Sequence, residues 1–195
     1  KEISDKELSK LLLEVEEINN KEQITYFEIL TGAFLKKANE KRNNINIIEA
    51  GLFHRFDATN IFDHNLASVI TAIGLDHTDW LPKHERTIDK IIFEKTSSLL
   101  NTKIIISNQD NTKTSSKIRE ALIKNSSKKI FFGELYSYSL SENNFFYYED
   151  EFGGLKLPLP NLLGSFQLDN IAAGIATLRN IEELEIKDEH IKKGI

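Results

Sequence analysis

The feature that most constrains the fold of this chain is an alternation of short apolar runs with helical segments. The first run, residues 67–73, is a continuous series of small and β-branched residues closed by Gly74, which is typical of a strand buried on both faces. Strands that alternate with helices pair in parallel, so the sequence predicts an α/β fold with a doubly wound, mostly parallel sheet and flanking helices. In chain order, the predicted elements are strand 67–73, helix 85–100, strand 103–107, helix 115–124 and strand 129–132.

Two helices and a strand are predicted upstream of this alternation. Ser4 with Glu7, and Thr25 with Glu28, have the spacing of capping boxes, and apolar residues at helical spacing follow each pair. Residues 44–50 are β-branched at three positions and end before a glycine, so we expect a short strand there.

Downstream of residue 134 the pattern changes. Three short strand-like runs, 135–140, 143–150 and 155–159, follow one another with polar turns and no helix between them. This spacing predicts a small antiparallel meander within residues 134–160, followed by a helix over 167–181.

Composition excludes several classes of protein. The formal net charge is −5, which does not favour the binding of nucleic acid. No apolar run reaches the length of about 18 residues that a membrane span requires. The sequence contains no cysteine, which rules out disulfides and fits a reducing compartment such as the cytoplasm.

Polar residues gather after two of the predicted strands. Glu49 ends the first of them and is followed by a loop dense in polar groups, and the segment 74–81 follows the strand at 67–73. In open α/β sheets, ligands bind beyond the carboxyl ends of the strands. Neighbouring parallel strands would therefore bring Glu49 and His77 to the same rim, as a cation-binding or acid–base pair.

Several short motifs follow one another along nearly the whole chain. In order they are Thr25-Tyr26-Phe27-Glu28 with Thr31, Arg55-x-Asp57-Ala58-Thr59-Asn60, Gly74-Leu75-Asp76-His77-Thr78-Asp79-Trp80-Leu81, Glu94-Lys95, and Leu162-Leu163-Gly164 with Gln167 and Asn170-Ile171-Ala172-Ala173. The set resembles the central domain of the folylpolyglutamate synthases and dihydrofolate synthases of the Mur-ligase superfamily. The second and third motifs are the most specific part of this resemblance.

The resemblance implies a Mur-ligase central-domain-like fold, in which residues 1–195 form an incomplete ATP-binding domain that includes the meander at 134–160. The family's Gly-x-x-x-x-Gly-Lys-Ser/Thr phosphate loop does not occur in this sequence. The chain also begins without methionine at Lys1 and ends abruptly at Ile195. We therefore expect a fragment that lacks the phosphate loop and the C-terminal domain and is itself inactive.

The activity that the resemblance implies is an ATP-dependent carboxylate–amine ligation in the cytoplasm. ATP phosphorylates the carboxylate of a folate or dihydropteroate, and the amine of glutamate attacks the acyl phosphate. The implied cofactors are ATP and Mg²⁺, and the implied partners are glutamate and folate-type small molecules, with no nucleic acid or membrane. The choice between dihydropteroate and folate, and the oligomeric state, stay open.

Individual residues take roles by the same resemblance. Glu49 and His77 correspond to magnesium ligands, although histidine is an unusual ligand for this hard cation. Lys95 corresponds to a catalytic lysine that the family carbamylates, and Asn170 to the asparagine that binds adenine. We expect the side-chain ends of Glu49, His77 and Lys95 to lie within roughly 10 Å of one another around one cation. The substrate loop consists of Arg55, Asp57, Thr59 and Asn60.

The chain departs from the family at three places. Phe53 and His54 replace paired glycines, so the close backbone approach that glycine permits is expected to be lost. Ser165 and Phe166 replace an arginine and a histidine on the nucleotide side. About three extra residues precede Lys95, which shifts its register.

Each candidate also has a purely structural alternative. In that alternative, Glu49 would be solvated or paired with a lysine, and His77 would be an ordinary loop histidine. Arg55 and Asp57 would form an ion pair that holds the loop, and Lys95 would be a solvated helix lysine. Asp169 and Asn170 would cap or flank a helix start. Two rival functions remain: a Mur-type enzyme that joins amino acids to cell-wall precursors, and a non-catalytic α/β binding module. A phosphate loop upstream in the parent gene favours a ligase over the module.

Overall fold

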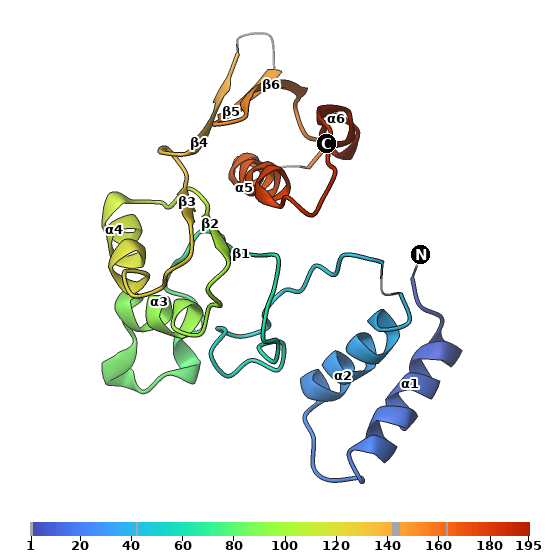
Figure 1. Cartoon of the computed structure of the whole chain (residues 1–195). Helices are drawn as coiled ribbons and strands as arrows, with labels where there is room; N and C mark the ends of the chain where they lie inside the picture. The colour runs from blue at the N-terminus through green and yellow to red at the C-terminus, as the bar shows by residue number, and fades with distance from the viewer. Residues whose placement is uncertain (1, 42, 142–144, 163) are drawn as a thin grey trace. The chain divides into compact units, whose positions relative to one another are not determined.

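The computed structural model describes residues 2–41, 43–141, 145–162 and 164–195. The chain divides into two compact units, an N-terminal unit of residues 1–61 and a C-terminal unit of residues 62–195 (Figure 1). The sequence predicted a single incomplete domain over the whole chain, and that assignment stays a prediction.

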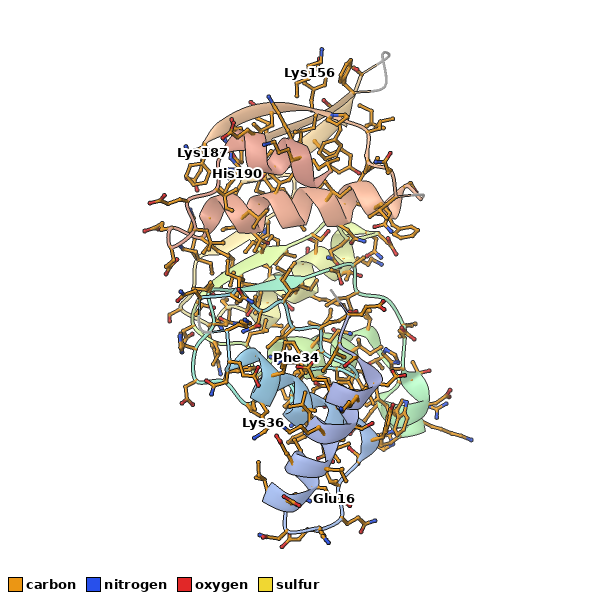
Figure 2. The ribbon with its side chains drawn as sticks, turned by 90° about the vertical axis from the view of Figure 1, so that its right-hand side faces the viewer. Glu16, Phe34, Lys36, Lys156, Lys187 and His190 are labelled. Carbon is orange, nitrogen blue, oxygen red and sulfur yellow. The ribbon has the colours of Figure 1, made fainter. Side chains whose placement is uncertain are left out.

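The N-terminal unit contains two helices that pack against each other, α1 (Asp5–Ile18) and α2 (Tyr26–Ala38). Both predicted caps are formed: Ser4 Oγ accepts a hydrogen bond from the backbone N–H of Glu7, and Thr25 and Glu28 make a complete capping box. Figure 2 shows the two helices from the side, with Glu16 on α1 and Phe34 on α2.

The strand predicted over residues 44–50 is not formed, and this prediction is wrong for the described residues. Residues 45–50 have no regular secondary structure, and Ile47 is 93 % exposed. β-branched residues favour an extended backbone, but a strand also needs a partner for its N–H and C=O groups. No strand among the described residues pairs with this segment.

The C-terminal unit contains a three-stranded parallel sheet in the order β1 (Ala67–Ile70), β2 (Lys103–Ile106) and β3 (Lys129–Phe131). The central strand β2 is buried on both faces, because Ile104, Ile105 and Ile106 are all fully buried. The predicted parallel pairing is confirmed, but β1 ends at Ile70 rather than at residue 73.

Helices cover both faces of this sheet. Figure 1 shows α3 (Ile88–Thr96) and α4 (Thr112–Ala121) on one side and α5 (Phe166–Asn180) on the other. The doubly wound fold is therefore confirmed. The helix predicted from residue 85 begins at 88, because Thr87 caps it by accepting a hydrogen bond from the N–H of Lys90, and the short 3₁₀ turns Thr78–Trp80 and Lys83–Glu85 precede it.

The predicted meander forms a second, antiparallel sheet in the order β4 (Tyr136–Leu140), β5 (Phe145–Asp150) and β6 (Gly153–Pro158). Residues 143 and 144, where the middle strand was expected to begin, lie outside the described residues. One face of the sheet packs with α5 in the main core of the unit. Lys156 lies on β6 near the end of the hairpin, and the last helix, α6 (Asp188–Gly194), begins beside Lys187, whose N–H donates to His190 Nδ1 (Figure 2).

Within the part of the chain that the structure describes, no helix is both long enough and apolar enough to cross a membrane.

Candidate functional site

Asp57 organises the polar loop at residues 51–60. Its Oδ2 accepts hydrogen bonds from the backbone N–H groups of Gly51 and Leu52, both at 3.0 Å. Its Oδ1 accepts from the N–H of Thr59 at 3.0 Å and from Thr59 Oγ1 at 2.6 Å. The carboxylate therefore closes the loop on itself, and the sequence motif Asp-Ala-Thr-Asn has a structural role in the described loop.

The same contacts set the ionisation of the loop. Burial by itself raises the pKa of Asp57, but hydrogen bonds from Thr59 and from the N–H groups of Leu52 and Gly51 outweigh it and leave the pKa below its usual value. Burial lowers the pKa of the neighbouring His54, against an opposing attraction to Asp57. Asp57 is therefore a carboxylate, and His54 favours its neutral form.

Backbone conformation explains why glycine suits this loop. Phe53 replaces a family glycine and adopts φ 58°, in the left-handed region where residues other than glycine are strained. At Gly51, an added Cβ would lie 2.7 Å from Cζ of Phe27, so α2 packs directly against the loop backbone. The loop keeps the glycine-like turn at residue 53 although a side chain is present.

His77 lies in a short, locally ordered loop after β1. It adopts φ 55°, and its N–H donates to Asp76 Oδ1 at 2.7 Å. Its Nε2 lies 3.5 Å from Asp76 Oδ2, and its carbonyl accepts from the N–H of Trp80 at 3.1 Å. The imidazole and the Asp76 carboxylate thus form one polar group near the surface, with 37 % and 76 % of their side chains exposed.

Lys95 is a half-buried residue in the last turn of α3. Its neighbour Glu94 is buried, with 5 % exposure, and pairs with Lys90 at 3.2 Å. Lys90 also contacts Glu85 at 2.9 Å. The Glu94-Lys95 pair of the motif therefore contributes one buried, paired carboxylate and one partly accessible amine.

Asn170 is exposed at the beginning of α5, where its Nδ2 donates to Gln167 Oε1 at 3.3 Å. The preceding residue, Asp169, accepts a hydrogen bond from Tyr138 Oη at 3.0 Å through its carboxylate, and from Ser107 Oγ at 3.3 Å through its backbone carbonyl. These contacts hold the first turn of α5 against β4 and the end of β2. Leu163 of the same motif lies outside the described residues.

The predicted site residues divide between the two units. The N-terminal unit carries Glu49, which is exposed, and the loop residues Arg55, Asp57, Thr59 and Asn60, which the structure does bring together. The C-terminal unit carries His77, Lys95 and Asn170. The predicted convergence of Glu49, His77 and Lys95 stays a prediction.

The available donors suit a divalent cation in part. The carboxylates of Glu49 and Asp76 are the oxygen donors that Mg²⁺ and Mn²⁺ prefer, and the imidazole of His77 suits a softer ion better. Among the described residues, no group of three or more histidine, aspartate or glutamate side chains is placed so that it could hold a metal ion. A magnesium ion bound partly by water and nucleotide phosphates requires only one or two protein carboxylates.

Gln109 and Asp169 make contacts that the sequence did not reveal. The Gln109 side chain bridges the ends of β1 and β2 through three hydrogen bonds. Its only sequence signal is its place, three residues beyond a buried strand, on the edge where ligands bind. Asp169 was seen in the sequence only as a helix-flanking residue.

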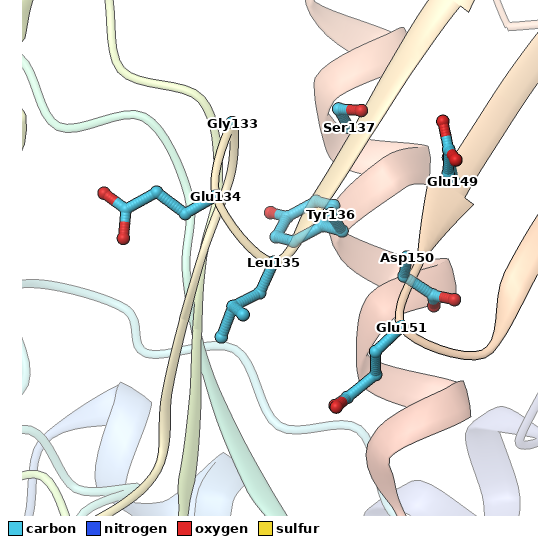
Figure 3. Close-up of a pocket in the computed structure, with 8 residues that line it drawn as sticks. All are labelled: Gly133, Glu134, Leu135, Tyr136, Ser137, Glu149, Asp150 and Glu151. Carbon is cyan, nitrogen blue, oxygen red and sulfur yellow. The ribbon is translucent and has the colours of Figure 1, made fainter.

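A shallow pocket of about 310 Å³ lies beyond β3, between β4 and β5 (Figure 3). Three of its acidic residues are paired with cations: Glu134 with Arg119, Asp150 with Arg179 and Glu151 with Lys128. None of the residues predicted to bind ligands lines it. The lining residues are Gly133, Glu134, Leu135, Tyr136, Ser137, Glu149, Asp150 and Glu151.

Comparison with known proteins supports the resemblance seen in the motifs. No protein-family model matches the chain. The chain is 31 % identical over 187 residues to the dihydrofolate synthase/folylpolyglutamate synthase of Escherichia coli, a match that covers 93 % of this chain and 40 % of that protein. It is 46 % identical over 77 residues to the corresponding protein of Haemophilus influenzae, covering 40 % of this chain and 17 % of that protein.

Solved structures agree in fold. E. coli FolC in complex with DHPP and ADP superimposes with a TM-score of 0.81 at 30 % identity, covering 100 % of this chain and 44 % of that chain. A bifunctional folylpolyglutamate synthase/dihydrofolate synthase with Mn, AMPPNP and L-glutamate bound superimposes with a TM-score of 0.83 at 28 % identity. The match covers 100 % of this chain and 45 % of that chain. The chain spans less than half the length of these relatives. In sequence and in fold, this chain is related to a part of the dihydrofolate synthase/folylpolyglutamate synthase proteins.

Proposed function

We propose that this chain belongs to an ATP-dependent ligase that adds glutamate to the carboxylate of a folate or dihydropteroate. The observation that carries the proposal is a likeness of about 30 % identity across nearly the whole chain to enzymes solved with ADP, DHPP or L-glutamate. In the proposed reaction the carboxylate attacks the γ-phosphate of ATP, ADP leaves, and the glutamate amine then displaces phosphate from the acyl phosphate. This chain would supply part of the central ATP-binding domain.

Such a reaction places most of the catalytic burden on charge neutralisation and positioning. Glu49 and His77, with Asp76 beside it, would hold Mg²⁺ near the transferred phosphate, and the Mn in one relative supports a divalent cation. Lys95 would act near the same cation, and Asn170 would bind the adenine. In the loop, Arg55 and Asn60 would face substrate, while Asp57 and Thr59 hold the loop together.

The test is a ligase assay on the complete gene product. Phosphate release should require ATP, Mg²⁺, glutamate and a folate or dihydropteroate together. His77→Ala and Glu49→Gln should each raise the Mg²⁺ concentration for half-maximal rate, by about tenfold or more, since they remove metal ligands. His84→Ala is the matched control for His77→Ala, because His84 is an exposed histidine of the same unit, with its Nε2 3.9 Å from Glu85 Oε1.

Other outcomes separate the rival functions. Phosphate release that depends on a cell-wall precursor instead of a folate would identify the Mur-type alternative. Binding without turnover of any of these substrates would identify the non-catalytic module, for which the departures at Phe53-His54 and Ser165-Phe166 are the support. Running the assay with dihydropteroate and with a reduced folate separately gives the substrate preference. A cytoplasmic location stays a prediction, which fractionation of cells would test.

The 195-residue chain by itself should bind ATP–Mg²⁺ weakly or not at all, because its sequence carries no phosphate loop. Isothermal titration calorimetry tests this directly. A dissociation constant in the micromolar range would contradict it.

A further inference from the structure

The Gln109 side chain uses both of its polar groups on the backbone of neighbouring strand ends. Its Oε1 accepts a hydrogen bond from the N–H of Ile73 at 3.0 Å. Its Nε2 donates to the carbonyl of Thr71 at 3.2 Å and to the carbonyl of Ser107 at 2.9 Å. One amide side chain therefore joins the segment after β1 to the segment after β2.

These hydrogen bonds lie directly beyond the last pair of residues in the parallel pairing of β1 and β2. The β1–β2 register stops at Ile70 opposite Ile106, and the N–H of Ser107 donates to the carbonyl of Ile70 at 2.8 Å. Beyond that point, residues 71–73 have no strand partner among the described residues, and backbone groups in that position require other partners. The Gln109 side chain accepts from the N–H of Ile73 and donates to the carbonyl of Thr71. It therefore replaces two of the backbone hydrogen bonds that a longer strand pair would make.

The segment that Gln109 holds leads directly into the loop of residues 74–81, which carries His77. The loop is anchored at both ends by buried residues, Ile73 and Leu81. The Leu81 carbonyl accepts from Arg86 Nε at 3.1 Å, and the Ile73 N–H is bound by Gln109. Gln109 is therefore the polar contact that fixes the first end of this loop.

We propose that Gln109 is a positioning residue, which holds the exit from β1 and thereby sets the position of His77 at the edge of the sheet. The part of this inference that concerns the metal rests on the proposed function, in which His77 binds a divalent cation. The three hydrogen bonds of the Gln109 side chain go to backbone groups, so its effect on the cation passes through the loop.

Asn125 provides a matched control at the other end of the same strands, where their amino ends lie. Its Nδ2 donates to the carbonyl of Leu99 at 3.1 Å, and its Oδ1 accepts from the N–H of Ser127 at 2.9 Å. These residues precede β2 and β3, whereas Gln109 follows β2. Gln109→Ala and Asn125→Ala thus remove the same kind of bond from a half-buried amide, one at each end of the strands.

The first measurement is hydrogen–deuterium exchange in the complete gene product, without ligands. Gln109→Ala should speed exchange in the peptides covering residues 71–81 by about tenfold or more, since three hydrogen bonds are lost. Gln109→Glu should also speed exchange there, because its carboxylate can still accept from the Ile73 N–H but sets an acceptor oxygen against the Thr71 and Ser107 carbonyls, to which the amide donated. In Asn125→Ala, faster exchange should be confined to peptides near residues 99–103 and 125–129. Unchanged exchange over 71–81 in a folded Gln109→Ala protein would overturn the proposal.

The second measurement is the Mg²⁺ concentration for half-maximal ligase rate. Gln109→Ala should raise it by about tenfold, as the loss of a residue that orients a metal ligand does, whereas Asn125→Ala should not. If His77→Ala raises this concentration and Gln109→Ala does not, Gln109 is only a stabilising residue and the proposal is wrong. If His77→Ala has no effect, the proposed metal role of His77 fails, and the exchange result alone then decides whether Gln109 positions the loop.

Discussion

Replacing Asp57 should loosen the 51–60 loop in two distinct steps. The carboxylate receives four hydrogen bonds, two at each oxygen. Asp57→Asn converts one oxygen to an NH₂ group, which cannot accept. With the NH₂ at Oδ2, the bonds from Gly51 and Leu52 are lost. With the NH₂ at Oδ1, the bond from the Thr59 N–H is lost but the Thr59 hydroxyl can turn to accept, so one or two of the four bonds are lost. Asp57→Ala loses all four.

The magnitude follows from the exposure of the loop. Because Asp57 is half-buried, water partly replaces the carboxylate, and each bond contributes about 0.5–1 kcal/mol. Asp57→Asn should then cost about 0.5–2 kcal/mol of loop stability and Asp57→Ala about 2–4 kcal/mol. In amide exchange these values correspond to rates faster by about 2- to 30-fold and about 30- to 700-fold.

The assay is hydrogen exchange by NMR at the amides of Gly51, Leu52 and Thr59, which donate directly to the carboxylate. Glu16→Gln removes one negative charge from an exposed position on α1 and serves as the control for net charge. Because the pKa of folded Asp57 lies below its usual 3.8, the stabilisation is present above that value and is lost as the pH falls through the lower folded-state pKa. Equal, unchanged exchange at all three amides in both variants would refute the assigned role of Asp57.

Three further predictions concern packing, ionisation and a buried ion pair. Gly51→Ala should destabilise the N-terminal unit by about 1–3 kcal/mol in urea unfolding, because the new Cβ meets the Phe27 ring at 2.7 Å. Tyr138 should ionise only as the pH rises to about 12 in an absorbance titration, because burial and the hydrogen bond to the Asp169 carboxylate raise its pKa. The contribution of this hydroxyl to folding stability is fully present below the pKa of tyrosine in the unfolded chain. It is lost as the pH rises through about 12. Arg179→Met should cost about 3 kcal/mol in urea unfolding, because the Asp150 carboxylate, 2 % exposed, loses its cation at 2.8 Å and keeps the hydrogen bonds from Tyr148 Oη and the Phe152 N–H.

Each of these has a control and a contradicting result. The double variant Gly51→Ala with Phe27→Leu should recover part of the loss, and equal losses would exclude the ring contact as the cause. Tyr138→Phe should remove the high-pH transition, and its persistence would assign the transition to another tyrosine. Asp150→Asn combined with Arg179→Met should be less destabilising than Arg179→Met alone, and a fully additive result would argue against a buried pair.

The sequence predicted the C-terminal unit well for a physical reason. Consecutive isoleucines such as those at 104–106, set between helical segments, favour a strand covered on both faces, and in the structure all three are fully buried. The caps at Ser4 and Thr25 were predicted for a similar reason, since they depend on residues three positions apart. The prediction of a strand over residues 44–50 was wrong. The β-branched residues favour an extended backbone, but the sequence does not show whether a neighbouring strand is present to pair with it.

The candidate site was predicted less completely. The residues of the Asp-Ala-Thr-Asn motif were identified from the sequence, and the ion pair between Arg55 and Asp57 stays a prediction. The sequence did not reveal that Asp57 also accepts hydrogen bonds from the backbone N–H groups of Gly51, Leu52 and Thr59. Backbone N–H groups are the same at every residue and leave no signature in the sequence. Phe53 shows the converse, since its left-handed backbone was detectable only as a departure from a family glycine.

By itself, the sequence determined the doubly wound α/β architecture, the antiparallel meander, the helix caps and the motifs that resemble the folate ligases. Those properties depend on residues close in the chain or on strong apolar periodicity. Only the tertiary structure revealed that Gln109 holds the backbone of Ile73, 36 positions away, and that Tyr138 binds Asp169 across 31. Such contacts depend on which strand ends and helix turns meet in space, and a single polar side chain in a sequence carries no record of its distant partner.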